Sequence, residues 1–276
     1  MSTAGNNINC VVQLGRYGDI INILPLLRHI HTHHGTPVLM VSSQFSDLLE
    51  GVSYVQPWVV DLDYSEILQA VRLAEDRYER VVVSQIWGAG YHHPDRGSSY
   101  TRDSWQRAGF GHLFDNDLLL PVFDRRVMDR ELGLIKALVG PESGVDYLVV
   151  QVTRSASSPY ANGERVLAMI RAEAAECGIK VVDIASYNAP RLFDFLGLLA
   201  AARMIVTIDT AILHLAAACP DTPCLAIINS RPWYGSEPRG KAWQRARYQD
   251  SVEDIRTTFR LMLDQVAAPQ RTAASG

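Results

Sequence analysis

Cysteine is scarce in this sequence of 276 residues, and neither sign of charge is in strong excess. The four cysteines show neither the spacing of a metal site nor the pairing of a disulfide framework, so we expect buried free thiols. A formal net charge of −4 argues against a general binder of nucleic acid or of anionic membranes. A local basic patch stays compatible with that charge.

Long hydrophobic segments are also missing. Asp194 and Arg203 interrupt the longest apolar candidate, so no run reaches the length of a membrane span. The first residues, STAGNNIN, are polar and lack the basic-then-apolar form of a secretion signal. We therefore expect a cytoplasmic protein with no integral membrane association.

What the chain does contain is typical of a globular protein. Apolar residues make up 47% of the sequence and charged residues 20%. The length suits two domains of about 130 residues each. The sequence is therefore long enough for two separate hydrophobic cores.

The first half alternates between apolar strands and amphipathic helices. Strands are predicted at residues 9–14, 38–41, 59–60, 80–84 and 118–121, and helices at 20–32, 45–49, 64–74 and 125–139. A βαβα rhythm of this kind predicts a parallel sheet covered by helices.

The pattern restarts after a linker at residues 140–144, GPESG. Strands are predicted at 147–152, 180–184, 204–208 and 224–228, and helices at 163–177, 191–202, 211–219 and 251–267. We therefore predict an α/β protein of two Rossmann-like domains that face each other across a cleft. Their expected bounds are 1–141 and 142–250, followed by a last helix and tail at 251–276.

The first predicted strand ends in a glycine turn, GRYGD, built from Gly15, Arg16, Tyr17, Gly18 and Asp19. The turn places Asp19 at a junction between a strand and a helix. A carboxylate there either accepts a proton from a substrate hydroxyl or caps its own helix. Both interpretations stay open on spacing alone.

The second half has a matching junction at residues 206–223, VTIDTAILHLAAACPDTP. An apolar strand ends in Asp209-Thr210, a helix of small residues begins at once, and His214 lies one turn later. A helix N-terminus at a strand end suits a phosphate group. The alternative is a capped, buried helix with a satisfied histidine.

Together the two junctions indicate a group-transfer reaction. One junction offers a carboxylate and the other a seat for phosphate, and ligands of α/β folds bind at such strand ends. The carboxylate would take the proton of an incoming hydroxyl while the anion seat stabilises a departing diphosphate.

The same residues resemble those of a known family. Residues 15–25 are similar to the G-x-x-G-D-x-x-x-x-x-P signature of the family 9 glycosyltransferases, the ADP-heptose:lipopolysaccharide heptosyltransferases. Asp209, Thr210, Ala211 and His214 are similar to that family's D-T-G-x-x-H motif, with one residue more before the closing Pro223.

The resemblance implies a GT-B fold, an inverting mechanism, no metal and no other cofactor. It also implies that the last helix packs back toward the first domain. By motif position, Asp19 would be the general base, and Asp209, Thr210, Ala211 and His214 would line the nucleotide-sugar donor.

The chain departs from the family at two places. Ala211 stands where the family has glycine, which leaves less room for backbone to approach a phosphate. The family also has a lysine in the loop after the strand at 147–152, and this chain has none there. The charge and hydroxyls of the loop would come instead from Thr153, Arg154, Ser155 and Ser157. Tyr187, after the next strand, would stack on the base of a nucleotide or pack as a surface tyrosine.

Two further segments are candidates for the acceptor side. Residues 85–111 are rich in Gly, aromatics, His and Arg, as in a substrate-binding loop or a packed surface excursion. Residues 231–248 are basic and aromatic, as in a binder of phosphates and bases or a solvated loop. The candidate residues are Trp87, Tyr91, His92, His93, Arg96, Arg102, Trp233 and Arg239. The paired histidines have no carboxylate at ligand spacing, so we expect no metal there.

The sequence therefore predicts a glycosyltransferase that moves a sugar from a nucleotide diphosphate to a hydroxyl. The acceptor is a saccharide or lipid-linked glycan, or else a hydroxylated base in DNA. Two alternatives stay open: a non-catalytic nucleotide-binding module, and a UDP-sugar epimerase on the same fold.

Overall fold

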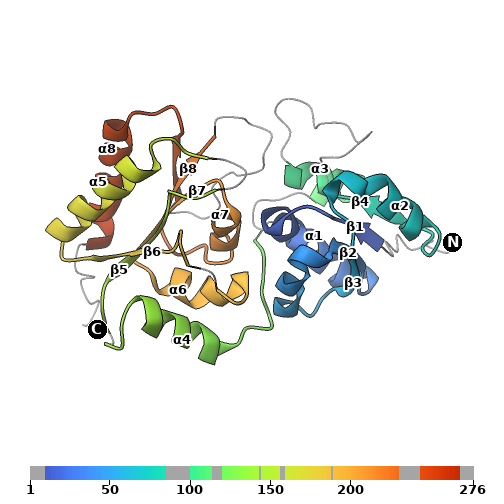
Figure 1. The fold of residues 1–276 in the computed structure, drawn as a ribbon. Helices are drawn as coiled ribbons and strands as arrows, with labels where there is room; N and C mark the ends of the chain where they lie inside the picture. The colour runs from blue at the N-terminus through green and yellow to red at the C-terminus, as the bar shows by residue number, and fades with distance from the viewer. Residues whose placement is uncertain are drawn as a thin grey trace, which may run out of the picture. The chain divides into compact units, whose positions relative to one another are not determined.

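The computed structural model describes residues 10–84, 100–113, 120–142, 144–155, 159–187, 189–229 and 243–267. These residues form two compact units, each with one parallel β-sheet between layers of helices (Figure 1). Unit 1 contains the described residues up to 127 and also 190–193; unit 2 contains those at 128–189, 194–229 and 243–267.

The sheet of unit 1 has four described strands, in the order β3-β2-β1-β4. They are β1 (Cys10–Val12), β2 (Val38–Ser42), β3 (Gln56–Val60) and β4 (Val81–Val83), and all neighbouring pairs are parallel. Val11 of β1 pairs with Leu39 of β2 and with Val82 of β4. All three β1 residues are fully buried, as expected for a parallel strand with helices on both faces.

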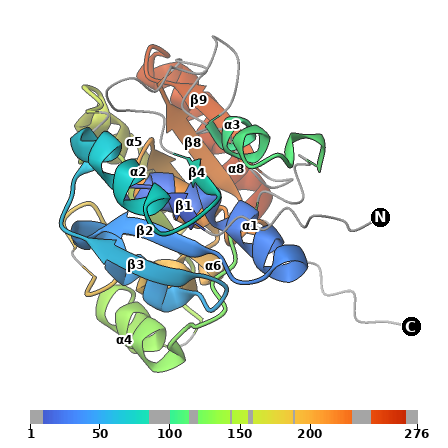
Figure 2. The same ribbon diagram turned by 90° about the vertical axis from the view of Figure 1, so that its right-hand side faces the viewer.

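Helices cover both faces of this sheet. Helix α2 (Ile67–Glu75) packs on one face through its apolar stripe, and α1 (Tyr17–His34) lies across the sheet from it (Figure 2). Helix α3 (Tyr100–Arg107) packs beside α1. Short 3₁₀ helices complete the unit: η1 (Ser43–Gly51), η2 (Tyr64–Glu66) and η3 (Gly111–Leu113).

The sheet of unit 2 has five described strands, in the order β6-β5-β7-β8-β9. They are β5 (Tyr147–Gln151), β6 (Lys180–Asp183), β7 (Met204–Ile208), β8 (Cys224–Ile228) and β9 (Trp243–Arg247), again all parallel.

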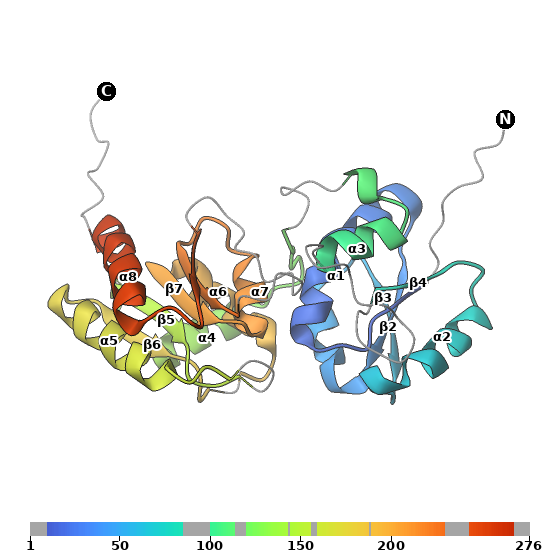
Figure 3. The same ribbon diagram turned by 90° about the horizontal axis from the view of Figure 1, so that it is seen from above.

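Two helix layers enclose the second sheet. Helices α5 (Gly163–Glu176) and α8 (Val252–Ala267) lie on one face (Figure 3). Helices α4 (Met128–Leu138), α6 (Leu196–Ala201) and α7 (Ala211–Ala216) lie on the other. The 3₁₀ helix η5 (Leu192–Phe195) directly precedes α6, and its first two residues are counted with unit 1. No helix in the described ranges is long and apolar enough to cross a membrane.

The predicted α/β class and the two parallel sheets are confirmed. Their facing across a cleft stays a prediction. Strand β9 was not expected, because Arg245 and Arg247 are charged and only Trp243 and Ala246 of the strand are buried. The strand predicted at 118–121 is not formed at residues 120–121, and its first two residues lie outside the described ranges.

The division between the units differs from the predicted bounds at two helices. Helix α4 packs on α6 of unit 2, although it precedes the glycine-rich linker that we took as the boundary. Helix α8 was expected to pack back toward the first domain. Its apolar stripe of Ile255, Phe259, Met262 and Leu263 lies in the core of unit 2, against α5, and the packing toward the first domain stays a prediction. Burial of a stripe of this length is the physical reason that α8 belongs with that unit.

Candidate functional site

The candidate residues gather at the carboxyl edge of each parallel sheet. In unit 1 the strand order reverses between β1 and β4, and in unit 2 between β5 and β7. Such reversal points are where open α/β sheets bind ligands. The residues that follow β1, β5 and β7 are therefore the candidates for ligand binding and catalysis.

The side chain of Gln13 holds the glycine turn of unit 1 in place through hydrogen bonds. This side chain is fully buried after β1, where its Oε1 accepts a hydrogen bond from the backbone N–H of Gly15 at 2.8 Å. Its Nε2 donates to the hydroxyl of Ser84, after β4, at 3.3 Å. Ser84 in turn donates to the carbonyl of Val12 at 3.2 Å. The turn is therefore fastened across the reversal point of the sheet.

Gly15 has no room for a side chain. A Cβ at this position would stand 2.5 Å from Oδ2 of Asp19 and 2.7 Å from Oε1 of Gln13. Both distances are far inside van der Waals contact. Position 15 thus requires glycine, because the amide of Gln13 and the carboxylate of Asp19 pack closely against the turn.

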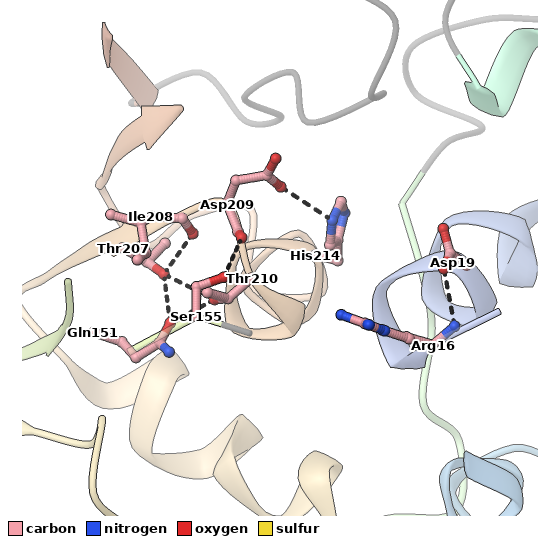
Figure 4. Close-up of polar contacts among 9 residues, drawn as sticks. All are labelled: Arg16, Asp19, Gln151, Ser155, Thr207, Ile208, Asp209, Thr210 and His214. Carbon is pink, nitrogen blue, oxygen red and sulfur yellow. Dashed lines mark hydrogen bonds and ion pairs between the residues drawn. The ribbon is translucent and has the colours of Figure 1, made fainter. Parts of the chain in front are cut away.

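Asp19 is the third residue of α1 and caps the N-terminus of that helix. Its Oδ2 accepts a hydrogen bond from the backbone N–H of Arg16 at 2.9 Å, as Figure 4 shows. The capping alternative is therefore observed. The Asp19 side chain is half-buried. Its role as a general base stays a prediction.

Tyr17 ties the first turn of α1 to η1. The Tyr17 hydroxyl donates to Oδ1 of Asp47 at 2.8 Å, and its ring meets the ring of Phe45 edge-on at 5.1 Å. Burial, followed by the hydrogen bond to Asp47, raises the pKa of Tyr17 well above its ordinary value. The phenol therefore stays protonated as a hydrogen-bond donor.

Gln151 is the centre of a polar network in unit 2 (Figure 4). Its Oε1 accepts from the hydroxyl of Thr210 at 2.5 Å and from that of Thr207 at 3.3 Å. Its Nε2 donates to the carbonyl of Arg154 at 2.7 Å. One amide thus joins the end of β5, the loop that follows it and the junction after β7.

Asp209 and His214 lie together above this network (Figure 4). The His214 Nε2 is 3.9 Å from Oδ1 of Asp209, which is an ion-pair distance if the histidine is protonated and too long for a hydrogen bond. Only 13% of the Asp209 side chain and 12% of the His214 side chain are exposed. The carbonyl of Asp209 accepts from the hydroxyl of Ser155 at 3.4 Å. The predicted grouping of Asp209, Thr210 and His214 is therefore present.

Thr210 stands at the N-cap of α7 without capping it through its side chain. The alternative of a helix capped at this junction is therefore not observed for the Thr210 side chain, because its hydroxyl donates to Gln151. Ala211 follows as the first residue of the helix, which spans only Ala211–Ala216 and is shorter than the predicted 211–219.

The other predicted residues fall into two groups. Thr153, Arg154 and Ser155 lie in the loop after β5, beside Gln151. Tyr187 is 37% exposed and its ring packs edge-on against Phe195 at 6.1 Å, which favours the packed-tyrosine alternative. Arg102 is exposed on α3. Outside the described residues lie Trp87, Tyr91, His92, His93, Arg96, Ser157, Trp233 and Arg239.

Four residues of these two networks were not predicted from the sequence: Gln13, Asp47, Gln151 and Thr207. A signal for the two glutamines was present: the first strand of each half ends in Val-Val-Gln. A polar residue that closes an otherwise apolar strand at a reversal point is a candidate for organising that point. Within the described ranges, no group of three or more His, Cys, Asp or Glu side chains is placed to hold a metal ion.

No protein-family model matches this sequence, and no curated protein matches it. Solved structures of glycosyltransferases share its fold. ADP-heptose LPS heptosyltransferase II of E. coli aligns over 94% of this chain and 98% of its own, at a TM-score of 0.63 and 16% identity.

Two more structures agree with this match. A family 9 glycosyltransferase of Veillonella parvula aligns over 94% of this chain and 91% of its own, at a TM-score of 0.62 and 10% identity. E. coli heptosyltransferase WaaC, solved with ADP, aligns over 92% and 99%, at a TM-score of 0.57 and 14% identity. The resemblance predicted from the two motifs is thereby confirmed in the fold: this chain has the GT-B fold of heptosyltransferases and of a family 9 glycosyltransferase.

Proposed function

We propose that this protein is a glycosyltransferase that moves a sugar from a nucleotide-diphosphate donor to an acceptor hydroxyl. One observation carries the proposal: the two motif-bearing junctions, at Asp19 and at Asp209-Thr210, both lie at reversal points of sheets in a fold shared with heptosyltransferases. A fold alone hosts many activities, so the residues at these points decide the function.

Unit 2 is proposed to hold the donor. The WaaC structure contains ADP, and the Asp209, Thr210 and His214 cluster stands where the family motif predicts donor contacts. Arg154 and Ser155, next to the cluster, supply a cation and a hydroxyl for the diphosphate in place of the family lysine. Because Ala211 and the missing lysine depart from the family's donor motifs, the assay tests a panel of nucleotide sugars that differ in nucleotide and in sugar.

Asp19 is proposed to be the general base. Its carboxylate would accept the proton of the acceptor hydroxyl as that oxygen attacks the anomeric carbon of the donor and the diphosphate leaves. Attack opposite the leaving group inverts the configuration at that carbon. The departing charge would be neutralised by Arg154 rather than by a metal ion, so turnover is expected to persist in excess EDTA.

A saccharide or lipid-linked glycan is the acceptor that we propose, in line with the name of ADP-heptose LPS heptosyltransferase II. A hydroxylated DNA base is the other acceptor class that the sequence predicts. Its support came from residues 231–248, of which 231–242 lie outside the described residues, and no comparison supports it.

The decisive assay measures nucleoside diphosphate released from a panel of nucleotide sugars, with and without candidate glycan acceptors. A thermal-shift screen first identifies the donor, because a ligand of the folded state raises its stability. Acceptor-dependent release is the expected result. Binding without release would favour the non-catalytic module, and acceptor-independent conversion of the sugar would favour the epimerase.

A further inference from the structure

We infer that Gln151 is a positioning residue that fixes the hydroxyl of Thr210 as a hydrogen-bond acceptor toward the bound donor. Thr210 then recognises a hydroxyl of the donor sugar and not an oxygen of the diphosphate. The inference rests on the proposed function and specifies how its donor site discriminates.

The orientation of the Gln151 amide is the first step. Its Nε2 lies 2.7 Å from the carbonyl oxygen of Arg154. A carbonyl only accepts hydrogen bonds, so the amide NH₂ must face it and the amide oxygen must face the two threonines. The reversed amide would place two acceptors in contact, so the assignment of oxygen and nitrogen is fixed by chemistry.

The direction of the Thr210 hydrogen bond follows. The Oε1 of Gln151 has no proton, so Thr210 must donate its single hydroxyl proton across the 2.5 Å contact. Thr207 does not compete for that role. Its fully buried hydroxyl lies 3.3 Å from the Oε1 of Gln151, 3.1 Å from the carbonyl of Ile208 and 3.5 Å from the hydroxyl of Thr210. Because Thr210 gives its proton to Gln151, Thr207 can only be the donor in its contact with Thr210.

Thr210 therefore has no proton for a ligand, and its oxygen keeps one lone pair for a ligand even where Thr207 donates to the other. An ionised diphosphate oxygen only accepts, so it finds no donor at this hydroxyl. A sugar hydroxyl donates, so it satisfies the Thr210 oxygen. Because Thr210 is half-buried, a mismatch there is costly, since a desolvated polar atom without a partner loses its water and gains nothing.

The test compares two dissociation constants by calorimetry for each variant. One is for the nucleoside diphosphate of the donor found in the panel screen, and the other is for the same nucleotide carrying its sugar. Thr210→Val removes the hydroxyl at nearly constant volume. We expect about tenfold weaker binding of the nucleotide sugar, the worth of one hydrogen bond, and binding of the diphosphate within about twofold of wild type.

Gln151→Leu removes the acceptor that consumes the Thr210 proton. The freed hydroxyl can then turn toward the diphosphate, so the preference for nucleotide sugar over diphosphate is expected to fall by about tenfold. Thr210→Ser keeps the hydroxyl and is expected to retain the wild-type preference. The double variant combines Gln151→Leu with Thr210→Val. Its preference for nucleotide sugar over diphosphate should fall no further than in either single variant, because each single variant already removes the same hydrogen bond.

Thr222→Val is the matched control. Thr222 is buried at the opposite edge of the sheet, before β8, and donates to the carbonyl of Ala200 at 3.4 Å. It should lower the thermal stability while leaving both dissociation constants unchanged. A variant that merely loosens the fold would resemble this control.

Three other results of these binding measurements would overturn the inference, in part or in full. Equal weakening of both ligands by Thr210→Val would place the hydroxyl on the diphosphate and overturn the inference, with the proposed function intact. An unchanged preference in Gln151→Leu would remove the positioning role. A wild-type protein that binds neither ligand class would overturn the proposed function and the inference with it.

Discussion

Gln13 of unit 1 and Gln151 of unit 2 occupy the same topological position. Each follows two valines at the carboxyl end of the first strand of its sheet, and each hydrogen-bonds to residues at the end of the strand beyond the reversal point. Gln13 fastens the turn before Asp19, and Gln151 fastens Thr210. The two halves therefore build their candidate sites by the same device with different chemistry.

Gly15→Ala tests how tightly Asp19 is packed. The added methyl would stand 2.5 Å from the Asp19 carboxylate, so the turn must shift. We expect a loss of about 1–3 kcal/mol in the free energy of unfolding by urea, together with loss of turnover.

Gly133→Ala is the control for that variant. Gly133 lies exposed within α4, with open space where the Cβ would be. Its replacement should raise the free energy of unfolding by up to about 1 kcal/mol, since alanine is the better helix former. Equal effects of the two substitutions would refute the packing argument at Gly15.

Glu173→Gln tests the attachment of α8 to unit 2. Glu173 on α5 is nearly buried and pairs with Arg260 at 2.7 Å and with Arg256 at 3.3 Å. Because both arginines are half exposed, we expect the charge removal to cost about 1–2 kcal/mol in urea unfolding.

Glu253 is the matched control, because it pairs with the same Arg256 at an exposed position. Glu253 pairs with Arg256 at 3.0 Å but is 71% exposed. Glu253→Gln should therefore cost less than about 0.5 kcal/mol. Similar costs at the two positions would mean that the buried pairing does not anchor α8.

The histidines at the end of α1 predict a dependence of stability on pH. Burial lowers the pKa of His29, and its neighbours His33, His34 and His112 lower it further. The unfolded state therefore binds a proton at His29 at a higher pH than the folded state does. The free energy of unfolding should fall as pH drops below the ordinary histidine value of about 6.5.

Urea unfolding at pH 7.5 and pH 5.5 measures this effect. His29 packs against the rings of Trp105 and Phe110, so His29→Phe keeps an aromatic ring there and should reduce the loss at low pH. His31→Gln, at an exposed position that contacts Thr36, should leave the loss unchanged. A wild-type protein equally stable at both values would contradict the argument.

The sequence predicted the fold because its strands are apolar and buried on both faces. Residues 147–152 and 204–208 have no other stable place than the centre of a parallel sheet. Strand β9 escaped prediction because its pairing with β8 is set by tertiary contact, and Gln244, Arg245 and Arg247 give it a polar composition.

The site was predicted less completely. Asp209, Thr210 and His214 were grouped correctly because a tight strand–helix junction brings them together. The network around Gln151 was not, because its partners lie 3 to 59 positions away along the chain. The packing of α8 in the core of unit 2 was not predicted, since an apolar stripe alone does not tell which sheet it covers; here it packs against α5, and Glu173 pairs with its arginines.

The proposed transfer depends most on Asp19 as the base, and Asp19→Asn tests that role alone. Asparagine keeps an oxygen that can accept from the Arg16 N–H, so the helix cap survives while the basic group is lost. The measurement is acceptor-dependent release of nucleoside diphosphate, beside calorimetric binding of the donor. We predict a fall in turnover of at least about 100-fold with donor affinity within about twofold of wild type. Turnover within a few-fold of wild type would contradict the account.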